Sequence, residues 1–172
     1  MEIKSTVVGK AGLPLSVFYR DIDSEKEFEG KKIDSIRAYC FYKNQLVVVR
    51  EAEGHWGLPG GKVEDGEKIR EATRREVMEE SNMKITKMRF VSIQEVVFPE
   101  GPAYHVVRMA CLVEPNGDFK VDPAGEVTEI KLIKPSGIIE LADAHWGKMA
   151  NRMLERALEI KKILETEVDC VR

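Results

Sequence analysis

Three glutamates one helical turn apart, Glu76, Glu79 and Glu80, are the residues of this sequence with the clearest chemical potential. Positions i, i+3 and i+4 are neighbours on a helix, and like charges at these positions repel each other. Two of the three also lie near the expected end of the helix, where the helix dipole disfavours negative charge. Local stability argues against the cluster, and a hard divalent cation bound through carboxylate oxygens would compensate for it.

The helix that positions these acids is expected from Lys68 to Ser81, a stretch rich in good helix formers and free of Gly and Pro. Asn82 marks its end, because Asn tolerates the left-handed conformation common just after a helix. When the helix is projected at about 100° per residue, its apolar side chains share one side, which should face a core. The glutamates then line the rim of that buried face.

The alternative reading of the cluster is an ordinary solvated helix face, since 33% of the residues are charged. A second helix, expected over residues 143–167, shows how such a face is usually built, with acids and bases interleaved along it. The cluster from Glu76 to Glu80 has Arg74 and Arg75 just before it and no basic residue within it. This contrast favours the metal-binding reading.

A Gly/Pro-rich turn precedes the helix and follows a strand-like run, Gln45 to Arg50; it reads Trp56-Gly57-Leu58-Pro59-Gly60-Gly61-Lys62. Two adjacent glycines let the backbone approach a ligand closely. A loop that leads into a helix can present backbone groups to a phosphate or a metal ion. Alone this is an ordinary turn signal, but joined to the glutamate helix it indicates a binding loop.

The stretch from Gly61 to Met83 resembles the Nudix box, G-x5-E-x7-R-E-U-x-E-E-x-G-U, in which U is a bulky aliphatic residue. The matching positions are Gly61, Glu67, Arg75-Glu76, Val77, Glu79-Glu80 and Met83. The one departure is Asn82, where the family has Gly, and Asn is the usual substitute at a left-handed helix cap. The preceding Trp56 to Gly61 also matches the usual lead-in of the family.

The resemblance implies an α/β (α+β) fold, the Nudix α/β/α sandwich with a mixed central β-sheet. It also implies hydrolysis of the diphosphate linkage in a nucleoside diphosphate joined to another group, with Mg²⁺ or sometimes Mn²⁺. Glu76, Glu79 and Glu80 would be metal ligands, and the Gly61 carbonyl would complete the coordination. One of the glutamates could also accept the proton of the attacking water.

We also expect four residues of the loop and helix to contact the substrate, namely Trp56, Gly60, Lys62 and Arg75. We further expect Arg75 to pair with Glu67 and so brace the loop against the helix. The alternative is that both side chains of this pair are merely exposed, since surface ion pairs contribute little.

A further acid from a later loop is common in the family, and Glu126 and Glu129 are the candidates here. Both follow Pro123-Ala124-Gly125, which reads as a loop leading into a strand from Val127 to Ile133. Either could be a general base or an additional ligand, and we place Glu126 first. The alternative makes Glu129 an outward strand residue and Glu126 an ordinary loop charge.

The substrate is less well defined by the sequence. The aromatic and histidine side chains that could contact a base are His55, Trp56, Phe98, Tyr104 and His105. Pro99 lies at an offset from Met83 similar to that in the ADP-ribose-hydrolysing subgroup, which slightly favours ADP-ribose or another ADP-sugar. A nucleoside triphosphate cleaved to the monophosphate is the enzymatic alternative. A nucleotide-sensing module without turnover is another, although such modules usually lack one of the box glutamates.

The composition fits one domain over residues 1–172, with residues 1–35 as an N-terminal addition of uncertain structure. A net charge of −3 argues against a nucleic-acid backbone binder. The three cysteines are too far apart for a disulfide framework; Cys40 and Cys111 lie in apolar runs typical of buried thiols, which favours a cytoplasmic protein. We expect no membrane span and no signal peptide.

The remaining elements follow from turn signals and apolar runs. Strands are expected at Glu2–Val8, Leu15–Arg20, Ile36–Tyr42, Gln45–Arg50, Lys87–Phe98, Tyr104–Val113 and Val127–Ile133, with a hairpin turn at Lys43-Asn44. A short helix should start at Pro135, with Ser136 near its cap. The last helix has a broad apolar stripe, which we expect to pack on its own sheet. A homodimer contact is the alternative use of that stripe.

Overall fold

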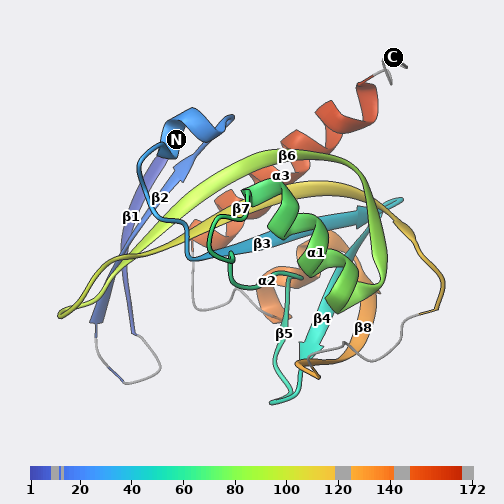
Figure 1. The fold of residues 1–172 in the computed structure, drawn as a ribbon, viewed down its shortest axis with the longest axis horizontal. Helices are drawn as coiled ribbons and strands as arrows, with labels where there is room; N and C mark the ends of the chain where they lie inside the picture. Colours follow the sequence, from blue (N-terminus) through green and yellow to red (C-terminus); the bar gives the residue numbers. More distant parts are fainter. Residues whose placement is uncertain (9–11, 13, 119–124, 142–147, 168–172) are drawn as a thin grey trace.

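The computed structural model describes residues 1–8, 12, 14–118, 125–141 and 148–167. Within this part of the chain, eight strands form one sheet in the order β1-β2-β6-β7-β3-β4-β5, with β8 paired to β4 (Figure 1). The strands are β1 (Glu2–Val8), β2 (Pro14–Asp21), β3 (Ser35–Tyr42), β4 (Gln45–Glu51), β5 (Trp56–Gly57), β6 (Met83–Val97), β7 (Tyr104–Pro115) and β8 (Val127–Ile133). The helices are η1 (Glu25–Phe28), α1 (Ile69–Ser81), η2 (Pro135–Gly137), α2 (Ile138–Leu141) and α3 (Lys148–Thr166).

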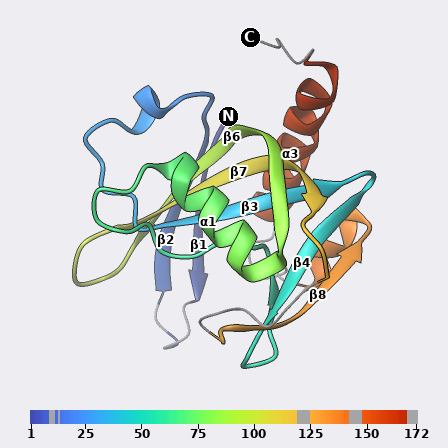
Figure 2. The same ribbon diagram turned by 45° about the vertical axis from the view of Figure 1, so that its right-hand side comes forward.

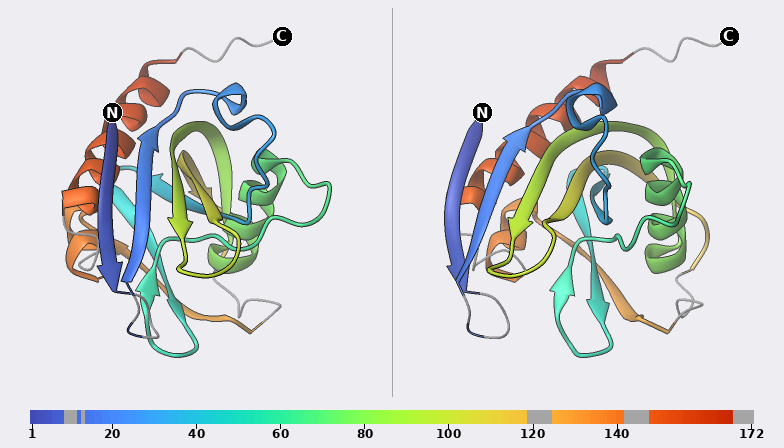
Figure 3. Two further views of the ribbon diagram at one scale, coloured as in Figure 1. Left: turned by 90° about the vertical axis from the view of Figure 1, so that its left-hand side faces the viewer. Right: turned by 60° about the vertical axis from the view of Figure 1, so that its left-hand side comes forward.

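Helices cover both faces of the sheet, with α1 on one side and α3 on the other (Figures 2 and 3). Two apolar clusters lie between these layers. Ile69, Ala72 and Val77 of α1 pack into one cluster, while Met149 and Met153 of α3 pack into the other. β3 runs parallel to β7 and the other strand pairs are antiparallel, so the sheet is mixed. The predicted α/β/α sandwich is confirmed.

The position of the glycine-rich turn follows from the short pairing between β3 and β4. These strands pair only at Phe41–Leu46 and Tyr42–Gln45, next to the predicted turn. Beyond that point β4 diverges and leaves one edge of β3 open. The residues after Leu58 fill this edge, because the N–H groups of Ile36 and Ala38 donate to the carbonyls of Gly61 (2.9 Å) and Pro59 (2.8 Å) respectively. The turn is therefore held as an extra strand-like segment beside α1.

The two N-terminal strands expected from the sequence are present. β1 and β2 pair along their whole length, from Glu2–Arg20 to Val8–Pro14. β2 then pairs with β6, so the hairpin extends the same sheet on the side away from β4. That the whole chain is one domain stays a prediction.

Several boundaries differ from the sequence-based expectation. β6 begins at Met83 and not at Lys87, because Asn82 takes left-handed angles (φ 50°, ψ 35°) that turn the chain directly from α1 into the strand. The short helix starts at Pro135, as predicted, and Ser136 lies close to the N-cap, which is Lys134. α3 is described from Lys148 onward, and the earlier start predicted for this helix falls outside the described residues.

The apolar stripe of α3 packs on the molecule's own sheet, as predicted. Ala157, Ile160 and Leu164 are at most 1% exposed and belong to the cluster that also contains Tyr39 and Phe41 of β3. The alternative use of this stripe, a homodimer contact, therefore has less apolar surface to draw on. None of the described helices combines the length and the apolar character that crossing a membrane requires.

Cys40 and Cys111 are free, fully buried thiols, as the sequence predicted. They lie opposite each other in the parallel pairing of β3 with β7. Burial, and then the neighbouring Cys111 thiol, raise the pKa of Cys40 well above its ordinary value. Cys40 is therefore a protonated packing residue in the α1-side cluster.

Candidate functional site

Glu76 and Glu80 both direct their carboxylates at the two adjacent glycines. Glu80 Oε2 accepts a hydrogen bond from the Gly60 N–H at 2.7 Å. Both carboxylate oxygens of Glu76 lie against Gly61, where an added Cβ would stand 2.5–2.6 Å from them. Glu76 is only 8% exposed, although it is an acid on a helix surface. The helix and the loop therefore form one polar site, which we call the Gly60–Gly61 site.

Glu79 has a different environment from Glu76 and Glu80. It corrects the expectation that the acid cluster has no basic partner of its own. Its side chain is 42% exposed and pairs with Arg75 Nη1 at 3.5 Å. The same guanidinium nitrogen donates to Glu76 Oε1 at 2.7 Å. The acid cluster thus has a cation of its own, because Arg75 lies one turn before Glu79 on the same helix face.

The predicted brace between Arg75 and Glu67 is present. Arg75 donates from Nε to Glu67 Oε1 (2.9 Å) and from Nη2 to Glu67 Oε2 (2.8 Å), while Nη2 also donates to the Lys62 carbonyl at 3.0 Å. Hydrogen bonds from Arg75 lower the pKa of Glu67. With Glu76 and Glu79, these acceptors engage all five N–H groups of the guanidinium. A direct bond from Arg75 to substrate would require the release of one of them.

The burial of Glu76 leaves its negative charge incompletely compensated. Its pKa is raised chiefly by burial, and the nearby charge of Glu79 adds to this effect. The hydrogen bond from Arg75 opposes the shift but does not cancel it. Glu76 is enclosed, lies close to a second carboxylate and is held by one arginine. An additional cation would therefore stabilise its ionised form further.

The donor atoms at the Gly60–Gly61 site fit a hard divalent cation, because they are carboxylate and carbonyl oxygens. Glu76, Glu80 and the Gly61 carbonyl would hold the ion. The Gly61 carbonyl also accepts the Ile36 N–H at 2.9 Å, which fixes its position. Among the residues that the structure describes, no three Asp, Glu, His or Cys side chains stand together as a metal-binding group. Glu79 would have to turn from Arg75 to join the other two carboxylates.

Each glycine is required at the site for its own reason. Gly60 has φ +141°, and an added Cβ would overlap the backbone carbonyl of Ile36, which cannot move without breaking the β3 edge. Gly61 has no such angle, and its added Cβ would instead displace the carboxylate of Glu76. The first glycine therefore shapes the loop, and the second makes room for the acid.

Arg37 is a site residue that the sequence analysis missed. Its Nη1 donates to the Gly60 carbonyl, and its charge lowers the pKa of Glu76 as a minor contribution. The available signal was an arginine within the otherwise apolar strand β3. Because β3 supplies the edge that holds the loop, a cation on this strand lies beside the acids of α1.

The other predicted substrate contacts occupy the surroundings of the loop. Lys62 is exposed and pairs with Ser35 through an isolated β-bridge. Trp56 is half-buried on β5, and Lys131 Nζ lies 4.2 Å from the centroid of its ring. Stacking of a base on this ring would compete with that cation–π contact. The substrate roles of Trp56, Gly60 and Lys62 stay predictions.

The later acids lie near the β4–β5 turn. The Glu126 carbonyl accepts a hydrogen bond from the Ala52 N–H at 2.9 Å, and its residue is exposed. Glu129 faces Arg50 across the β4–β8 pair and binds it at 3.5 Å. This pairing favours the outward-strand reading of Glu129. The role of Glu126 as a general base stays a prediction.

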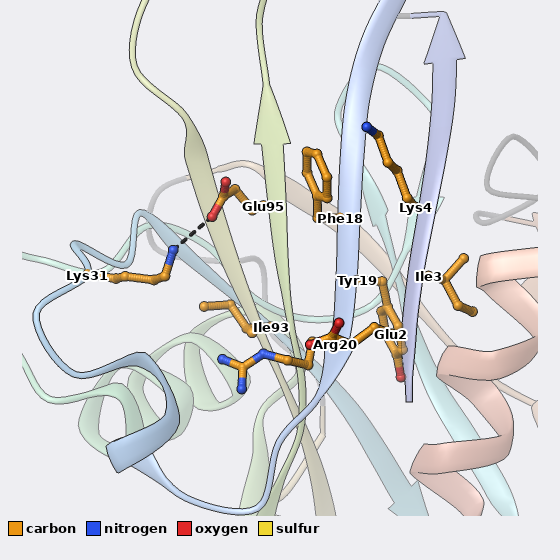
Figure 4. A pocket seen from close by; sticks show the side chains of 9 residues that line it. All are labelled: Glu2, Ile3, Lys4, Phe18, Tyr19, Arg20, Lys31, Ile93 and Glu95. Carbon is orange, nitrogen blue, oxygen red and sulfur yellow. Dashed lines mark hydrogen bonds and ion pairs between the residues drawn. The ribbon is translucent and has the colours of Figure 1, made fainter.

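Two cavities lined by described residues lie apart from the acids. One of about 340 Å³ lies over β1, β2 and β6, with Phe18 and Ile93 among its lining residues (Figure 4). The Lys31–Glu95 ion pair, at 2.8 Å, closes one side of it. A second cavity, of about 290 Å³, lies between η1 and residues 63–69. Neither is lined by Glu76, Glu79 or Glu80.

The comparison with protein families agrees with the fold and the acid helix. A family model of the NUDIX domain matches residues 31–154. The chain belongs to the Nudix family. The match begins before β3 and ends within α3, so it includes the Gly60–Gly61 site and both helical layers of the Nudix domain.

Curated relatives of this Nudix chain differ in what their names say they act on. The NAD-capped RNA hydrolase NudC of Photorhabdus laumondii is 42% identical over 71 residues, which are 41% of this chain and 26% of that protein. NudC of Salmonella schwarzengrund is 37% identical over 120 residues, 62% and 39% of the two chains. The human 8-oxo-dGDP phosphatase NUDT18 is 40% identical over 68 residues, 40% and 19% of the chains. The matches thus take in less than half the length of each relative.

Solved structures agree with the fold of the Nudix domain. The crystal structure of the Bacillus subtilis pyrophosphohydrolase has a TM-score of 0.68 at 14% identity and covers 90% of this chain and 97% of that one. At this identity the likeness concerns the fold alone.

Proposed function

We propose that this Nudix chain hydrolyses the diphosphate linkage of a nucleoside diphosphate derivative with a divalent cation. One observation carries the proposal: Glu76 and Glu80 converge on the Gly60–Gly61 backbone from one helix. Acids placed for stability alone would point to water or pair with bases along the helix. Here Glu76 is enclosed against Gly61 in addition to its bond with Arg75, and Glu80 is fixed to the Gly60 N–H.

The residues of the site would have separate roles in the proposed reaction. Mg²⁺ or Mn²⁺, when bound, would neutralise phosphate oxygens and lower the pKa of a bound water. Glu76, Glu80 and the Gly61 carbonyl would hold that cation, with Glu79 as a further ligand. Arg75 and Glu67 keep the loop against the helix. A glutamate of the cluster, or Glu126 from the later loop, would accept the proton of the attacking water.

The substrate class is a finer proposal, with a slight preference for ADP-ribose or another ADP-sugar. Pro99, which suggested this class, lies in the β6–β7 turn next to the exposed ring of Phe98. A nucleoside triphosphate is the rival substrate. The names of the relatives do not decide between them, because an NAD cap and 8-oxo-dGDP are both nucleoside diphosphate compounds.

A nucleotide-sensing module without turnover is the alternative from a different class. The sequence keeps all three box glutamates, and Glu76 and Glu80 meet at the Gly60–Gly61 site. This favours the enzyme, because closely spaced acids are costly to retain without a use. We also propose a cytoplasmic location, supported by the free thiols Cys40 and Cys111. We also propose a homodimer. The apolar stripe of α3 does not support it, because this stripe packs on the sheet of its own molecule.

A substrate panel tests the proposed function. Purified protein is incubated with ADP-ribose, other ADP-sugars, NAD and nucleoside triphosphates, with Mg²⁺, with Mn²⁺ or with EDTA. Products are identified by mass spectrometry, so that cleavage at a diphosphate is distinguished from loss of a terminal phosphate. We expect metal-dependent cleavage to a nucleoside monophosphate. Tight nucleotide binding with no turnover of any compound would favour the sensor.

A further inference from the structure

Arg108, on β7, is a buried cation that the proposed reaction does not use. The residue is only 5% exposed, and its Nη1 is enclosed with no hydrogen-bond partner. Within the described part of the chain, no carboxylate forms an ion pair with this guanidinium. A buried charge without a partner is costly, because it loses its hydration and gains nothing in return. Its retention therefore calls for an anion from elsewhere.

Strand alternation shows which way Arg108 points. Its neighbours Val107 and Met109 belong to the apolar cluster under α1. Successive side chains on a strand point to opposite faces, so Arg108 faces the α3 side of the sheet. Arg37 on β3 also lies between two residues of the α1-side cluster and therefore faces the α3 side as well.

The register brings these two arginines side by side. Arg37 lies opposite Arg108 in the parallel β3–β7 pair, and Ser92 lies opposite Arg108 in the β6–β7 pair. Neighbouring strands are about 4.8 Å apart, and like charges directly opposite each other are destabilising. Ser92 is fully buried and supplies a hydroxyl group on the other side of Arg108. Two arginines and a hydroxyl group therefore lie in one row across three neighbouring strands.

This row is connected to the Gly60–Gly61 site. Arg37 donates to the Gly60 carbonyl, while the Gly60 N–H donates to Glu80. Arg108 is thus one strand farther from the Gly60–Gly61 loop than Arg37. An anion bound by both arginines would lie on the α3 side of the sheet, where Arg37 connects it to this loop.

We propose that Arg108, together with Arg37 and Ser92, binds a phosphate group of the nucleotide substrate other than the one attacked. The identity of the ligand rests on the proposed function. A guanidinium matches phosphate oxygens with two parallel hydrogen bonds, and it remains charged when buried. The bound phosphate would supply the counter-charge that Arg108 lacks, and it would orient the rest of the substrate.

The test uses inorganic phosphate and pyrophosphate as probes, in EDTA, so that binding does not depend on a metal ion. Isothermal titration and melting temperatures are measured for the wild-type protein, Arg108→Met, Arg108→Lys and Glu80→Gln. We expect both probes to raise the melting temperature of the wild type and of Glu80→Gln. In Arg108→Met the dissociation constant should rise about ten- to a hundredfold, the usual worth of a charge-assisted hydrogen bond. The dissociation constant of Arg108→Lys should lie between those of the wild type and Arg108→Met, because lysine keeps a point charge.

The ligand-free proteins give an independent readout. Arg108→Met should melt at or above the wild-type temperature, because the variant loses an uncompensated charge and keeps most of the side-chain volume. A large fall in melting temperature, with no effect of phosphate on the wild type, would assign Arg108 to a carboxylate within the chain and overturn the proposal. Undiminished phosphate binding by Arg108→Met would also overturn it.

Failure of this inference is distinguishable from failure of the proposed function. If Glu80→Gln loses the response to phosphate and Arg108→Met keeps it, the anion binds at the Gly60–Gly61 site and the Arg108 proposal is wrong. If no nucleotide is hydrolysed but phosphate binding still depends on Arg108, the anion site stands and the enzymatic proposal fails.

Discussion

Glu80 differs from its two neighbours because its carboxylate is fixed by a backbone donor. The Gly60 N–H holds one oxygen at 2.7 Å, whereas Glu76 is held by Arg75 and by enclosure against Gly61. This difference lets the charge of Glu80 be changed while its structural contact is preserved. An amide oxygen can accept the same hydrogen bond.

Glu80→Gln should therefore lower kcat about 10²–10⁴-fold, the range expected for loss of a catalytic acid–base or ligand group. Its melting temperature should change little, because the hydrogen bond from Gly60 remains. The measurement is steady-state kinetics on the best substrate of the panel, with thermal unfolding in parallel. Glu155→Gln, at an exposed position of α3, is the matched control. Retained activity with a collapsed melting temperature would make Glu80 a structural residue.

The two glycines give a second residue-scale prediction. Gly60→Ala should lower the melting temperature strongly, because the new Cβ meets the Ile36 backbone and φ is +141°. Gly61→Ala should fold but lose most activity, because its Cβ displaces the Glu76 carboxylate. Gly57→Ala, whose Cβ meets nothing within 4 Å, serves as the control. Equal effects of the first two changes on stability and activity would contradict these separate roles.

At the scale of elements, the sequence was most informative where local chemistry decides the structure. The extent of α1 and its end at Asn82 were predictable, because helix formers and a left-handed cap act locally. The early start of β6 could not be predicted in the same way. It depends on the backbone angles of Asn82, which direct the chain from α1 straight into pairing with β7. The contact of the two glycines with Glu76 and Glu80 could not be predicted either. It depends on the open edge of β3 that holds the loop, and this edge results from the strand order.

Arg37 and Arg108 are a second case in which the sequence shows the residues but not their arrangement. Each is a charge within an apolar strand and was visible as such in the sequence. Their meeting depends on the parallel pairing of β3 with β7, which joins segments far apart in the chain. A pattern of one strand cannot specify its neighbour, so the row of cations emerges only in the assembled sheet.

The Arg75–Glu67 brace yields a prediction at the element scale. A double-mutant cycle with Glu67→Gln and Arg75→Met should give a coupling free energy of about 1 kcal/mol, because the two hydrogen bonds form between mostly enclosed side chains. The free energy of unfolding of the four proteins is measured with urea. An additive cycle would mean that the loop does not depend on this pair.

At the scale of the whole molecule, an ion pair joins the N-terminal extension to α3. Arg152 Nη2 donates to Asp21 Oδ2 at 2.5 Å, and the Tyr19 hydroxyl donates to Oδ1 at 2.7 Å. Burial alone would raise the pKa of Asp21, but the hydrogen bonds from Arg152 and Tyr19 outweigh burial and lower it. β2 and the last helix are therefore joined across one face of the sheet.

The lowered pKa predicts how this link responds to pH. Asp21 should contribute stability above its unfolded pKa of about 4, and this contribution should vanish as the pH falls through the lower folded value. Asp21→Asn should reduce the free energy of unfolding at pH 7 by about 1–3 kcal/mol. Urea unfolding at pH 7 and at about pH 2.5 checks this, with Asp65→Asn, exposed in the loop, as the control. A difference that is equal at both pH values would contradict the link.

The central claim is that the acids and the Gly60–Gly61 loop hold a divalent cation at the reacting diphosphate. Its most direct test is a Mn²⁺ titration followed by electron paramagnetic resonance, compared with the Mn²⁺ dependence of hydrolysis. The wild type should bind Mn²⁺ over the same concentration range that activates it, and Glu76→Gln and Glu80→Gln should weaken both effects together. Hydrolysis that persists in EDTA, or Mn²⁺ binding that is unchanged in both variants, would contradict the account.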